Sequence, residues 1–461
     1  MKSYDMIVIG TGPAGQRAAI QAAKLGKRVA IVEKKEFVGG VCINTGTIPS
    51  KTLREAVLYL SGFRQRGLYG ISYAVKKDIT IEDLTFRCQH VIKSEIEVIR
   101  AQLQRNRVDL LAGQASFLDP HHIRVESATG QQDDYEANFI VISTGTTPAR
   151  SPLFPVDGRT IIDSDRIFDL PKIPRSMTIV GGGIIGTEYA CMFATLSVAV
   201  TLVELRPKLL DFVDDEIVEA LCYHMRDIGV RLRLGEAVER VEVSPEGRAV
   251  AHLKSKKLIV SDTLLYAVGR QGNTESLNLA AAGLKTDERG RLSVNEHFQT
   301  AVPHIYAAGD VIGFPSLASV AMEQGRLASC HAFGVPSTAV PELFPYGIYT
   351  IPEISYVGQT EEQLTEAGIP YEVGIARYRE IARGQIIGDQ TGMLKLLFHR
   401  ETRKLLGVHI IGEGAAELVH IGQVVLTYGG TIEYFINNVF NYPTLAECYK
   451  VAAFAGVNKL L

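Results

Sequence analysis

The sequence predicts an α/β protein in which two similar βαβ units are followed by a C-terminal α+β region. Its 461 residues are enough for roughly three domains of about 150 residues each. A glycine pattern, G-x-G-x-x-G, occurs twice, each time between an apolar strand-like run and a helix-like run. The composition, 46% hydrophobic and 21% charged, is typical of a globular protein. These three observations define the expected fold class.

The first glycine pattern follows the apolar run 6–9 and contains Gly10, Gly12 and Gly15. An alanine-rich stretch after it predicts a helix, and the next apolar run ends in Glu33, 23 residues after Gly10. In such a unit the first glycine makes a tight turn and the second lets backbone N–H groups approach a pyrophosphate. The third lets the helix pack on the strand, and the closing carboxylate accepts hydrogen bonds from a ribose.

The second glycine pattern repeats these features. It follows the apolar run 177–180, contains Gly181, Gly183 and Gly186, and its next strand ends in Glu204. Glu204 again lies 23 residues after the first glycine. Two ordinary glycine-rich turns would not be expected to share the strand, the spacing and the acid. The sequence therefore predicts two Rossmann-like domains that bind two dinucleotides, a resident flavin and an exchanging nicotinamide.

The order of these features predicts a discontinuous first domain. We expect a flavin-binding part at 1–150, a nicotinamide-binding domain at 151–269, the second flavin-binding part at 270–338 and a separate domain at 339–461. Proline-rich crossings near residues 148–155 and 336–345 mark the two changes of domain.

Charge and cysteine content exclude several function classes. A net charge of -3 gives no electrostatic footprint for nucleic acid. No apolar run approaches the roughly 20 residues that span a bilayer, and no leader or transit segment is expected before the run 6–9. The six cysteines form no C-x-x-C pair, which argues against a zinc site or a secreted disulfide framework. We expect a cytoplasmic protein without a metal.

The segment 39–51, Gly-Gly-Val-Cys-Ile-Asn-Thr-Gly-Thr-Ile-Pro-Ser-Lys, resembles the redox-active stretch of the pyridine nucleotide-disulfide oxidoreductases. The domain order resembles that family over the whole chain. In the family this segment faces the flavin, so the resemblance assigns non-covalent FAD to the first unit and NAD(P)H to the second. It also implies that the C-terminal domain forms a homodimer or higher homo-oligomer and reaches into the partner's active site.

Two departures from the family pattern remove its disulfide chemistry. The family has a second cysteine where this chain has Thr47, and a histidine where it has Tyr442. A dithiol needs two sulfurs and a base for the thiol proton, and a phenol is a poor base at neutral pH. Cys42 is left either as a small buried residue, which we favour, or as a thiol that forms a sulfenic acid. Glu447, which orients the family's histidine, is expected to make structural hydrogen bonds instead.

The resemblance implies a set of site residues. Lys51 and Glu188 match the family's ion pair beside the flavin N5, where hydride enters, and are the expected catalytic residues. The expected cofactor-binding residues are Gly10, Gly12, Gly15, Glu33, Gly40, Cys42, Lys51, Thr144, Gly145, Asp310 and Ala318 for the flavin, and Gly181, Gly183, Gly186, Glu204, Arg206 and Gly269 for the nicotinamide nucleotide.

One branch of the family shares both departures and passes hydride between NADPH and NAD+. The resemblance to that branch implies a ping-pong reaction through FAD, with NADPH, NADH, NAD+ and NADP+ as partners. Glu204 favours a free 2'-hydroxyl, while Arg206 either turns toward a 2'-phosphate or is a solvated side chain. The alternatives are an NAD(P)H oxidase or peroxidase that uses Cys42, a disulfide reductase, and a non-catalytic flavoprotein that senses the NADPH/NADP+ ratio.

Overall fold

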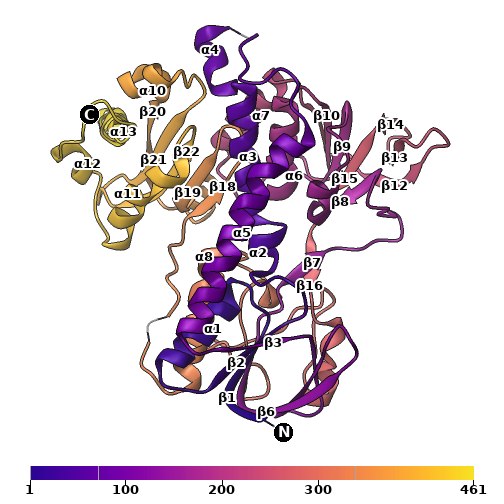
Figure 1. Ribbon diagram of the computed structural model, residues 1–461. Helices are drawn as coiled ribbons and strands as arrows, with labels where there is room; N and C mark the ends of the chain where they lie inside the picture. Colours follow the sequence, from indigo (N-terminus) through magenta and orange to yellow (C-terminus); the bar gives the residue numbers. More distant parts are fainter. Residues whose placement is uncertain (1, 71, 338, 461) are drawn as a thin grey trace. The chain divides into compact units, whose positions relative to one another are not determined.

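The computed structural model describes residues 2–70, 72–337 and 339–460 and has the mixed α/β architecture that the sequence predicts. The chain forms two compact units (Figure 1). The first unit contains Met1–Leu53, Thr85–Ala149 and Gly269–Pro341, and the second contains Arg54–Leu84, Arg150–Val268 and Glu342–Leu461.

The first unit is built on a main sheet, and helices pack around it. Its strands are β1 (Lys2–Ile9), β2 (Val29–Glu33), β3 (Asp109–Ala112), β4 (Gln114–Phe117), β5 (His122–Glu126), β6 (Gln132–Ile142), β7 (Thr146–Pro148), β16 (Arg270–Gly272) and β17 (Ile305–Ala307). Its helices are α1 (Pro13–Lys24), α2 (Gly40–Asn44) and α8 (Ala318–Ala332), together with parts of α3 (Thr47–Ser61) and α5 (Ile81–Arg105).

The sheet of the first unit has the order β3-β2-β1-β6-β5-β4, and β17 also pairs with β6. Strands β1, β2, β3, β6 and β17 are parallel, while β4 and β5 are antiparallel. Both faces of β1 are buried. Met6 and Val8 pack with residues of α1 and α8, and Ile7 and Ile9 pack with residues of β4 and β5. This explains why β1 is a continuous apolar run rather than an alternating one.

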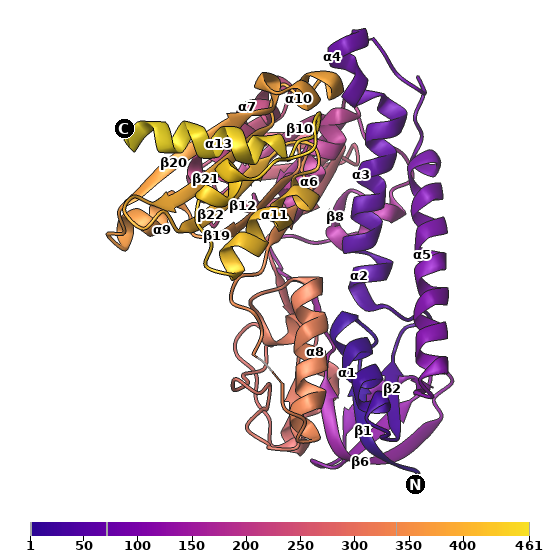
Figure 2. The same ribbon diagram turned by 90° about the vertical axis from the view of Figure 1, so that its left-hand side faces the viewer.

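Helices α1 and α8 lie side by side in the first unit (Figure 2). A Cβ atom on Gly325 of α8 would lie 2.0 Å from the carbonyl oxygen of Ala14 in α1, so the two backbones meet at a glycine. The serine hydroxyl of Ser329 donates to the carbonyl oxygen of Ala18 at 2.8 Å. These two contacts hold the first half of α1 against α8.

The second unit contains three sheets. Its strands are β8 (Ile161–Asp163), β9 (Ser176–Val180), β10 (Ala199–Glu204), β11 (Arg231–Leu234), β12 (Val238–Val243), β13 (Ala249–Leu253), β14 (Leu258–Ser261), β15 (Thr263–Tyr266), β18 (Tyr346–Ile348), β19 (Ile354–Gly358), β20 (Tyr371–Arg377), β21 (Met393–His399) and β22 (Leu405–Ile411). Its helices are α4 (Arg66–Tyr69), α6 (Ile184–Thr195), α7 (Asp215–Asp227), α9 (Glu361–Glu366), α10 (Ala382–Ile387), α11 (Ala415–Thr427), α12 (Glu433–Asn437) and α13 (Glu447–Val457).

The first of these sheets is parallel, in the order β11-β10-β9-β15-β8, and repeats the strand–turn–helix–strand arrangement of the first unit. A small antiparallel sheet, β12-β13-β14, follows it. The C-terminal sheet is antiparallel, in the order β18-β19-β22-β21-β20, and α11 and α13 contact it. Figure 2 shows α13 lying across β20 and β21. A large cluster of buried apolar side chains fills the space between this sheet and its helices.

The division into units bears on the expected domains. The chain leaves the first unit after Ala149 and returns to it at Gly269. The region expected to bind the nicotinamide nucleotide, up to Val268, and the C-terminal region from Glu342 fall in one unit, together with residues 54–84. The four-part division remains a prediction, and its expected boundary at residue 338 lies outside the described residues.

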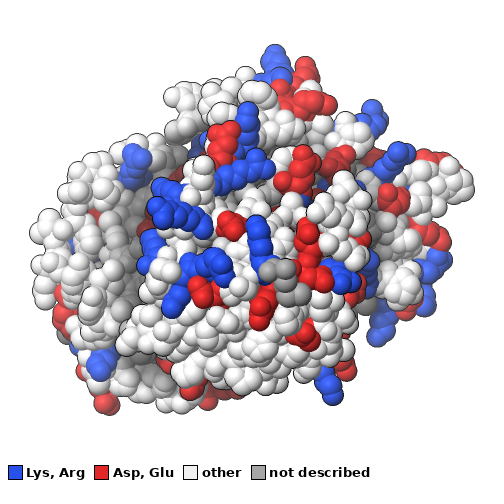
Figure 3. Space-filling model, turned by 60° about the horizontal axis from the view of Figure 1, so that its bottom comes forward, with Lys and Arg blue, Asp and Glu red and all other residues white. Residues whose placement is uncertain are grey.

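Lysine and arginine side chains are interspersed with aspartate and glutamate side chains on the face shown in Figure 3. That face therefore lacks the single-sign surface that contacts a nucleic acid backbone. Among the described residues, no helix is long and apolar enough to cross a membrane. The same residues include no cluster of His, Cys, Asp and Glu side chains that could hold a metal ion.

Candidate functional site

The first glycine turn joins β1 to α1 and leaves the start of the helix open. Gly10 has a φ of +105°, and a Cβ atom there would lie 2.5 Å from the carbonyl oxygen of Ser143. A Cβ atom on Gly15 would lie 1.9 Å from the carbonyl oxygen of Gly10. Gly12 caps α1 without a side-chain hydrogen bond and has open space where a Cβ would be. The turn therefore presents a helix N-terminus that favours an anion.

The second glycine turn, between β9 and α6, has the same geometry. Gly181 has a φ of +109°, and a Cβ atom there would lie 2.5 Å from the carbonyl oxygen of Ala267. A Cβ atom on Gly186 would lie 1.9 Å from the carbonyl oxygen of Gly181. Gly183 caps α6 and again has open space around it. The two turns thus have the same backbone conformation.

Each closing acid is bound back to its own turn. Glu33, at the end of β2, accepts hydrogen bonds from the backbone N–H of Thr11 at 3.2 Å and of Lys35 at 2.9 Å. It also accepts the Thr11 hydroxyl. Glu204, at the end of β10, accepts the backbone N–H of Gly182 at 2.5 Å. Both carboxylates are buried and held at the edge where a ribose would lie in a Rossmann-like unit.

Arg206 makes the second turn different from the first. Its Nε lies 2.9 Å from Glu204 Oε1, and its Nη1 lies 2.6 Å from Asp211 Oδ1. Burial alone would raise the pKa of Glu204, but hydrogen bonds from Arg206 and Gly182 outweigh it and hold that pKa below its usual range. The Arg206 side chain is therefore held by ion pairs rather than solvated on its own, and its expected contact with a 2'-phosphate remains a prediction. It is paired with two carboxylates, and Asp211 was not among the residues singled out from the sequence.

The segment expected to face the flavin packs on the first turn. The backbone N–H of Gly39 donates to the Thr11 hydroxyl oxygen at 2.9 Å. Gly40 has a φ of +62°, and a Cβ atom on it would lie 3.0 Å from the Cα of Gly12. The two glycines thus allow α2 to begin directly beside the open end of α1.

Cys42 and Lys51 lie close together in the first unit. Cys42 is on α2, Thr47 begins α3, and Lys51 follows one turn later on α3. Cys42 forms no disulfide. Burial raises the pKa of the Cys42 thiol, although a hydrogen bond with Thr47 and the charge of Lys51 act in the opposite direction. A thiol held in its protonated form is a weak nucleophile.

Asp310 reaches the same region from the returning part of the chain. It follows β17 and Gly309, whose backbone N–H donates to the Gln324 side chain at 2.9 Å. Burial raises the pKa of Asp310, while the nearby Arg270 and Thr146 act to lower it. Arg270 in turn donates from Nε to the Thr146 hydroxyl oxygen at 2.9 Å. The sequence reasoning missed Arg270, which no local pattern distinguishes from a surface arginine.

Four other expected site residues lie at turns or at the start of a helix. Gly145 has a φ of +64°, and its carbonyl oxygen accepts the backbone N–H of Asn273 at 3.0 Å. The hydroxyl of Thr144 is buried and has no hydrogen-bond partner among the described residues. Gly269 has a φ of +94° and accepts the backbone N–H of Ala149. Ala318, the first residue of α8, starts a helix whose N-cap makes no side-chain hydrogen bond.

Glu188 is buried in the first half of α6, in the second unit. Its Oε1 accepts the backbone N–H of Tyr349 at 2.8 Å. In the next residue of that segment, the carbonyl oxygen of Thr350 accepts Nε of the buried Arg54 at 2.9 Å. Tyr349 and Arg54 therefore fix the position of the Glu188 carboxylate and its surroundings, and sequence reasoning missed both. The expected pairing of Glu188 with Lys51 remains a prediction.

The C-terminal residues at the positions of the family's acid–base pair, Tyr442 in place of the histidine and the matching Glu447, are differently exposed. Tyr442 is 73% exposed and precedes a cis peptide bond to Pro443. Glu447 begins α13, and its Oε2 is buried without a hydrogen-bond partner among the described residues. That oxygen makes no hydrogen bond to the described residues, and the expected structural role of Glu447 remains a prediction.

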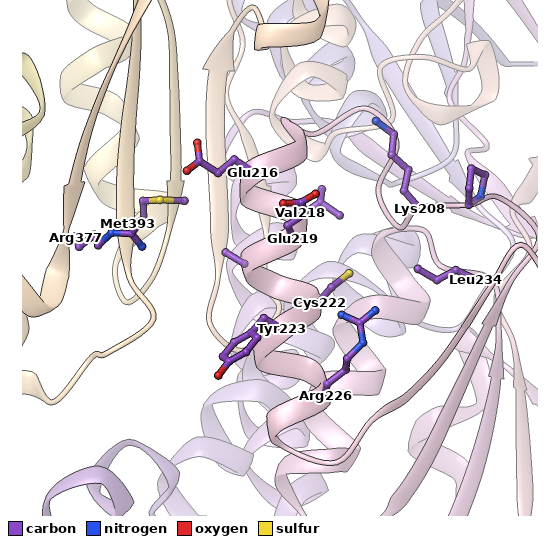
Figure 4. Close-up of a pocket in the computed structure, with 12 residues that line it drawn as sticks. Lys208, Glu216, Val218, Glu219, Cys222, Tyr223, Arg226, Leu234, Arg377 and Met393 are labelled. Carbon is purple, nitrogen blue, oxygen red and sulfur yellow. The ribbon is translucent and has the colours of Figure 1, made fainter. Parts of the chain in front are cut away.

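A cavity of about 680 Å³ lies alongside α7 in the second unit (Figure 4). Its lining carries charges of both signs, from Lys208, Arg226 and Arg377 and from Glu216 and Glu219. The side chains in Figure 4 lie on both sides of α7, so the space is a groove along the helix rather than a closed chamber. None of these residues was expected at the site.

The two glycine turns and the α+β C-terminal region define a flavin-dependent oxidoreductase that uses nicotinamide nucleotides. Residues 4–325 match the family model for pyridine nucleotide-disulphide oxidoreductases. Residues 344–453 match the model for the dimerisation domain of the same family. The chain belongs to the pyridine nucleotide-disulphide oxidoreductase family.

The curated relatives carry a more specific name. Proteins called soluble pyridine nucleotide transhydrogenase in Mycobacterium tuberculosis and Mycobacterium bovis are 57% identical over 461 residues, which is 100% of this chain and 98% of theirs. A protein of the same name in Colwellia psychrerythraea is 48% identical and covers 99% of this chain and 98% of its own.

Solved structures with the same fold are more distant. The HOCl-induced flavoprotein disulfide reductase RclA from Escherichia coli, as its Cu(II) complex, has a TM-score of 0.89 at 28% identity and covers 98% of this chain and 99% of its own. LpdA from Mycobacterium tuberculosis has a TM-score of 0.89 at 25% identity, with 100% of both chains covered. The fold is therefore that of the flavoprotein disulfide reductases.

Proposed function

We propose that this chain transfers hydride between NADPH and NAD+ by way of a bound FAD, without a redox-active disulfide. The observation that carries the proposal is the combination of two intact dinucleotide turns with threonine and tyrosine at the family's second cysteine and histidine positions. The full-length relatives at 57% identity, which are named as transhydrogenases, support the same activity.

The residues of the first unit fit a bound FAD. Gly10, Gly12 and Gly15 would hold its pyrophosphate at the start of α1, and Glu33 would accept hydrogen bonds from the adenosine ribose. The buried, unpartnered hydroxyl of Thr144 supports this assignment, since such a group is usually satisfied by a ligand or water. When bound, FAD supplies a reversible two-electron acceptor for hydride.

Other residues of the first unit would hold the remaining parts of that cofactor. Asp310 would bind the ribityl chain, and the glycine pair that begins α2 would let the backbone approach the ring system closely. Ala318 at the open start of α8, Cys42 and Gly145 would line the same site. Lys51 would place a positive charge near the ring, which favours the reduced, more negative form.

The second unit would bind one nicotinamide nucleotide at a time. Gly181, Gly183 and Gly186 would hold the pyrophosphate at the start of α6, with Gly269 at the neighbouring turn. Glu204 would bind the 2'-hydroxyl of NAD(H), and Arg206 the 2'-phosphate of NADP(H). Glu188 would pair with Lys51 where hydride enters. Since hydride moves without a proton, no general acid or base is required at Tyr442 or Glu447.

The dimerisation domain suggests a homo-oligomer, and we propose a homodimer as its smallest form. In that assembly the exposed Tyr442 would approach the partner's flavin site, where the family has its histidine. A phenol there can exclude water and position a nucleotide without serving as a base at neutral pH.

The direct test is a steady-state assay of the purified holoenzyme with NADPH and thio-NAD+. We expect reduction of thio-NAD+ and no comparable reduction of lipoamide or glutathione disulfide. Denaturation should release non-covalent FAD, identified by its absorbance and by chromatography against FMN. Brisk disulfide reduction without thio-NAD+ reduction would refute the proposed function, and colourless protein that takes up no FAD would refute the cofactor.

A further inference from the structure

The guanidinium of Arg206 is shared between two carboxylates of different exposure. Nε and Nη2 lie 2.9 and 3.3 Å from the oxygens of Glu204, and Nη1 lies 2.6 Å from Asp211 Oδ1. The Glu204 side chain is only 7% exposed, whereas that of Asp211 is 42% exposed and that of Arg206 is 40% exposed. All three nitrogens of the guanidinium are thus engaged, and the contact with Asp211 is the one that faces solvent.

The Asp211 carboxylate is fixed by its attachment to the second glycine turn. The two residues before it, Leu209 and Leu210, are fully buried. The backbone N–H of Leu210 donates to the carbonyl oxygen of Gly182 at 3.2 Å, and its own carbonyl oxygen accepts the N–H of Val213 at 2.8 Å. Asp211 therefore stands at a defined position beside the nucleotide-binding turn rather than on a loose loop.

A 2'-phosphate needs the donors that these two carboxylates occupy. Arginine binds phosphate best through two parallel N–H groups. Glu204 is held in place by the backbone N–H of Gly182 as well as by Arg206, so it is the harder of the two acids to displace. A phosphate that reaches Arg206 must therefore compete mainly with Asp211, and it must also tolerate a second negative charge at close range.

We propose that Asp211 is a specificity-determining residue that competes with the 2'-phosphate of NADP(H) for Arg206. Asp211 lowers the affinity for 2'-phosphorylated nucleotides and leaves NAD(H), which has no such group, unaffected. It thereby keeps one site usable by both nucleotides. Only the benefit of this competition to the enzyme rests on the proposed function. The competition for Arg206 is a property of the binding site and can be measured without catalysis.

The test compares two nucleotide fragments that lack nicotinamide, adenosine 2',5'-bisphosphate and AMP, by titration calorimetry on the holoenzyme. Asp211→Asn keeps the size of the side chain and removes its charge. It should tighten binding of the bisphosphate by roughly 3- to 10-fold, the range expected when an exposed ion pair and a like charge are both relieved. Binding of AMP should stay within about twofold, which also shows that the variant is folded.

The matched control is Asp215→Asn. Asp215 pairs with Lys208 at 2.5 Å and has a side-chain exposure of 48%. Its replacement by asparagine removes the same charge as Asp211→Asn, four residues further along the chain. It should leave the ratio of bisphosphate to AMP affinity unchanged. In an Arg206→Ala background, Asp211→Asn should likewise lose its effect, because the two residues act on one interaction.

Several results would overturn the inference. They are equal changes for the two fragments, weaker bisphosphate binding in Asp211→Asn, the same gain in Asp215→Asn, and a gain that persists without Arg206. Absence of any bisphosphate binding to the wild type and Asp211→Asn would overturn it too. The proposed function fails by a separate route, through the absence of thio-NAD+ reduction, and the binding ratios remain measurable in that case.

Discussion

Arg206 is the residue expected to lie where the two nicotinamide couples differ chemically, at the 2' position of the adenosine ribose. In the first unit, the residue two places after the closing acid, Lys35, contacts Glu33 only through its backbone N–H. In the second unit the equivalent residue folds its side chain back onto Glu204 and extends it to Asp211. Two turns with matching backbones thus differ in the charges beside the closing acid. In the proposed function these charges would decide which nucleotide each turn prefers.

Replacing Arg206 with alanine should therefore weaken use of NADPH more than use of NADH. Charge-assisted hydrogen bonds are worth about 1.5–3 kcal/mol, but Arg206 exchanges existing pairs for the phosphate. We expect the lower end, a loss of about 10-fold in kcat/KM for NADPH relative to NADH. Arg231→Ala, at the far end of β11, is the control and should affect both substrates equally. Equal losses in the Arg206 variant would show that it does not contact the phosphate.

Cys42 illustrates how one substitution changes the chemistry open to a flavin site. Its thiol has a raised pKa from burial and has Thr47, not a second cysteine, beside it. Anaerobic titration with dithionite should consume two electrons per flavin, and Cys42→Ser should keep most of the transhydrogenase activity. A four-electron endpoint, or near-complete loss of activity in the serine variant, would support the sulfenic-acid alternative.

At the scale of elements, different glycines of the second turn are expected to serve stability and nucleotide binding. A Cβ atom on Gly186 would lie 1.9 Å from a backbone oxygen, whereas Gly183 has open space and a φ of -78° that alanine adopts readily. Gly186→Ala should displace α6 and destabilise the protein by about 1–3 kcal/mol. Gly183→Ala should keep the stability within about 0.5 kcal/mol yet raise KM for both nucleotides, since it fills the space a pyrophosphate needs.

The stability of both variants is measured by thermal unfolding, and their KM values by steady-state kinetics on the same preparations. A Gly183 variant with unchanged KM would show that the pyrophosphate does not approach the start of α6. A Gly186 variant as stable as the wild type would show that α6 can shift without cost.

A second feature at this scale is the buried ion cluster that ties β21 to the start of α7. Lys395 is fully buried, and its Nζ lies 2.8 Å from Asp214 Oδ1 and 3.1 Å from Glu216 Oε2. It also pairs with Glu361. Burial opposes the charge on Asp214, but His409 and Lys395 hold its pKa below the usual range. Burial also lowers the pKa of His409, although the charge of Asp214 acts in the opposite direction.

Lys395→Met should therefore destabilise the protein by roughly 3–5 kcal/mol, because it leaves buried carboxylates without a counter-charge. Adding Asp214→Asn should recover part of the loss. The exposed pair of Lys256 and Glu239 is the control, and Lys256→Met should cost about 1 kcal/mol at most. Melting temperatures of the holoenzyme report all three changes. Losses of the same size at Lys256 and Lys395 would contradict the assigned role.

The same cluster predicts the direction of a pH effect. Asp214 has a folded-state pKa below its unfolded value, so the stability it contributes is present above the unfolded pKa. That stability is lost as the pH falls through the folded pKa. The difference in melting temperature between wild type and Asp214→Asn should thus be constant near neutral pH and shrink only in acid.

At the scale of the whole molecule, patterns within about thirty residues were predictable and contacts between distant segments were not. The strand at 6–9 and the alanine-rich helix after the first glycine pattern follow from local sequence, and they appear as β1 and α1. Helix α5 was missed, although its buried residues Ile81, Leu84 and Cys88 have helical spacing, because its overall composition is polar.

The candidate site shows the same division. The glycine turns and their closing acids were predictable because each device lies within one βαβ unit. The bond between Glu188 and the N–H of Tyr349 joins residues 161 apart in sequence. The pair of Arg206 and Asp211 depends on the burial of the two leucines before Asp211, which fixes a loop that has no periodic pattern. Such contacts are decided by packing and leave no local signal.

The number of nucleotide sites in the whole molecule predicts its kinetics. The described residues contain one glycine turn of each kind, and the turn at Gly181–Gly186 is the one expected to bind nicotinamide nucleotides. NADPH and NAD+ must then occupy the same turn in succession, so the first product leaves before the second substrate binds. Double-reciprocal plots at several fixed acceptor concentrations should be parallel, the ping-pong pattern.

Each substrate should also inhibit at high concentration, because it then occupies the turn in the redox state that belongs to the other. Asp211→Asn offers a matched check on this reasoning. If it tightens binding of NADP(H) alone, inhibition by NADPH should begin at a lower concentration, while inhibition by NAD+ should not change. Converging plots together with a demonstrated ternary complex of enzyme, NADPH and NAD+ would refute succession at one site, since both nucleotides would then be bound at once.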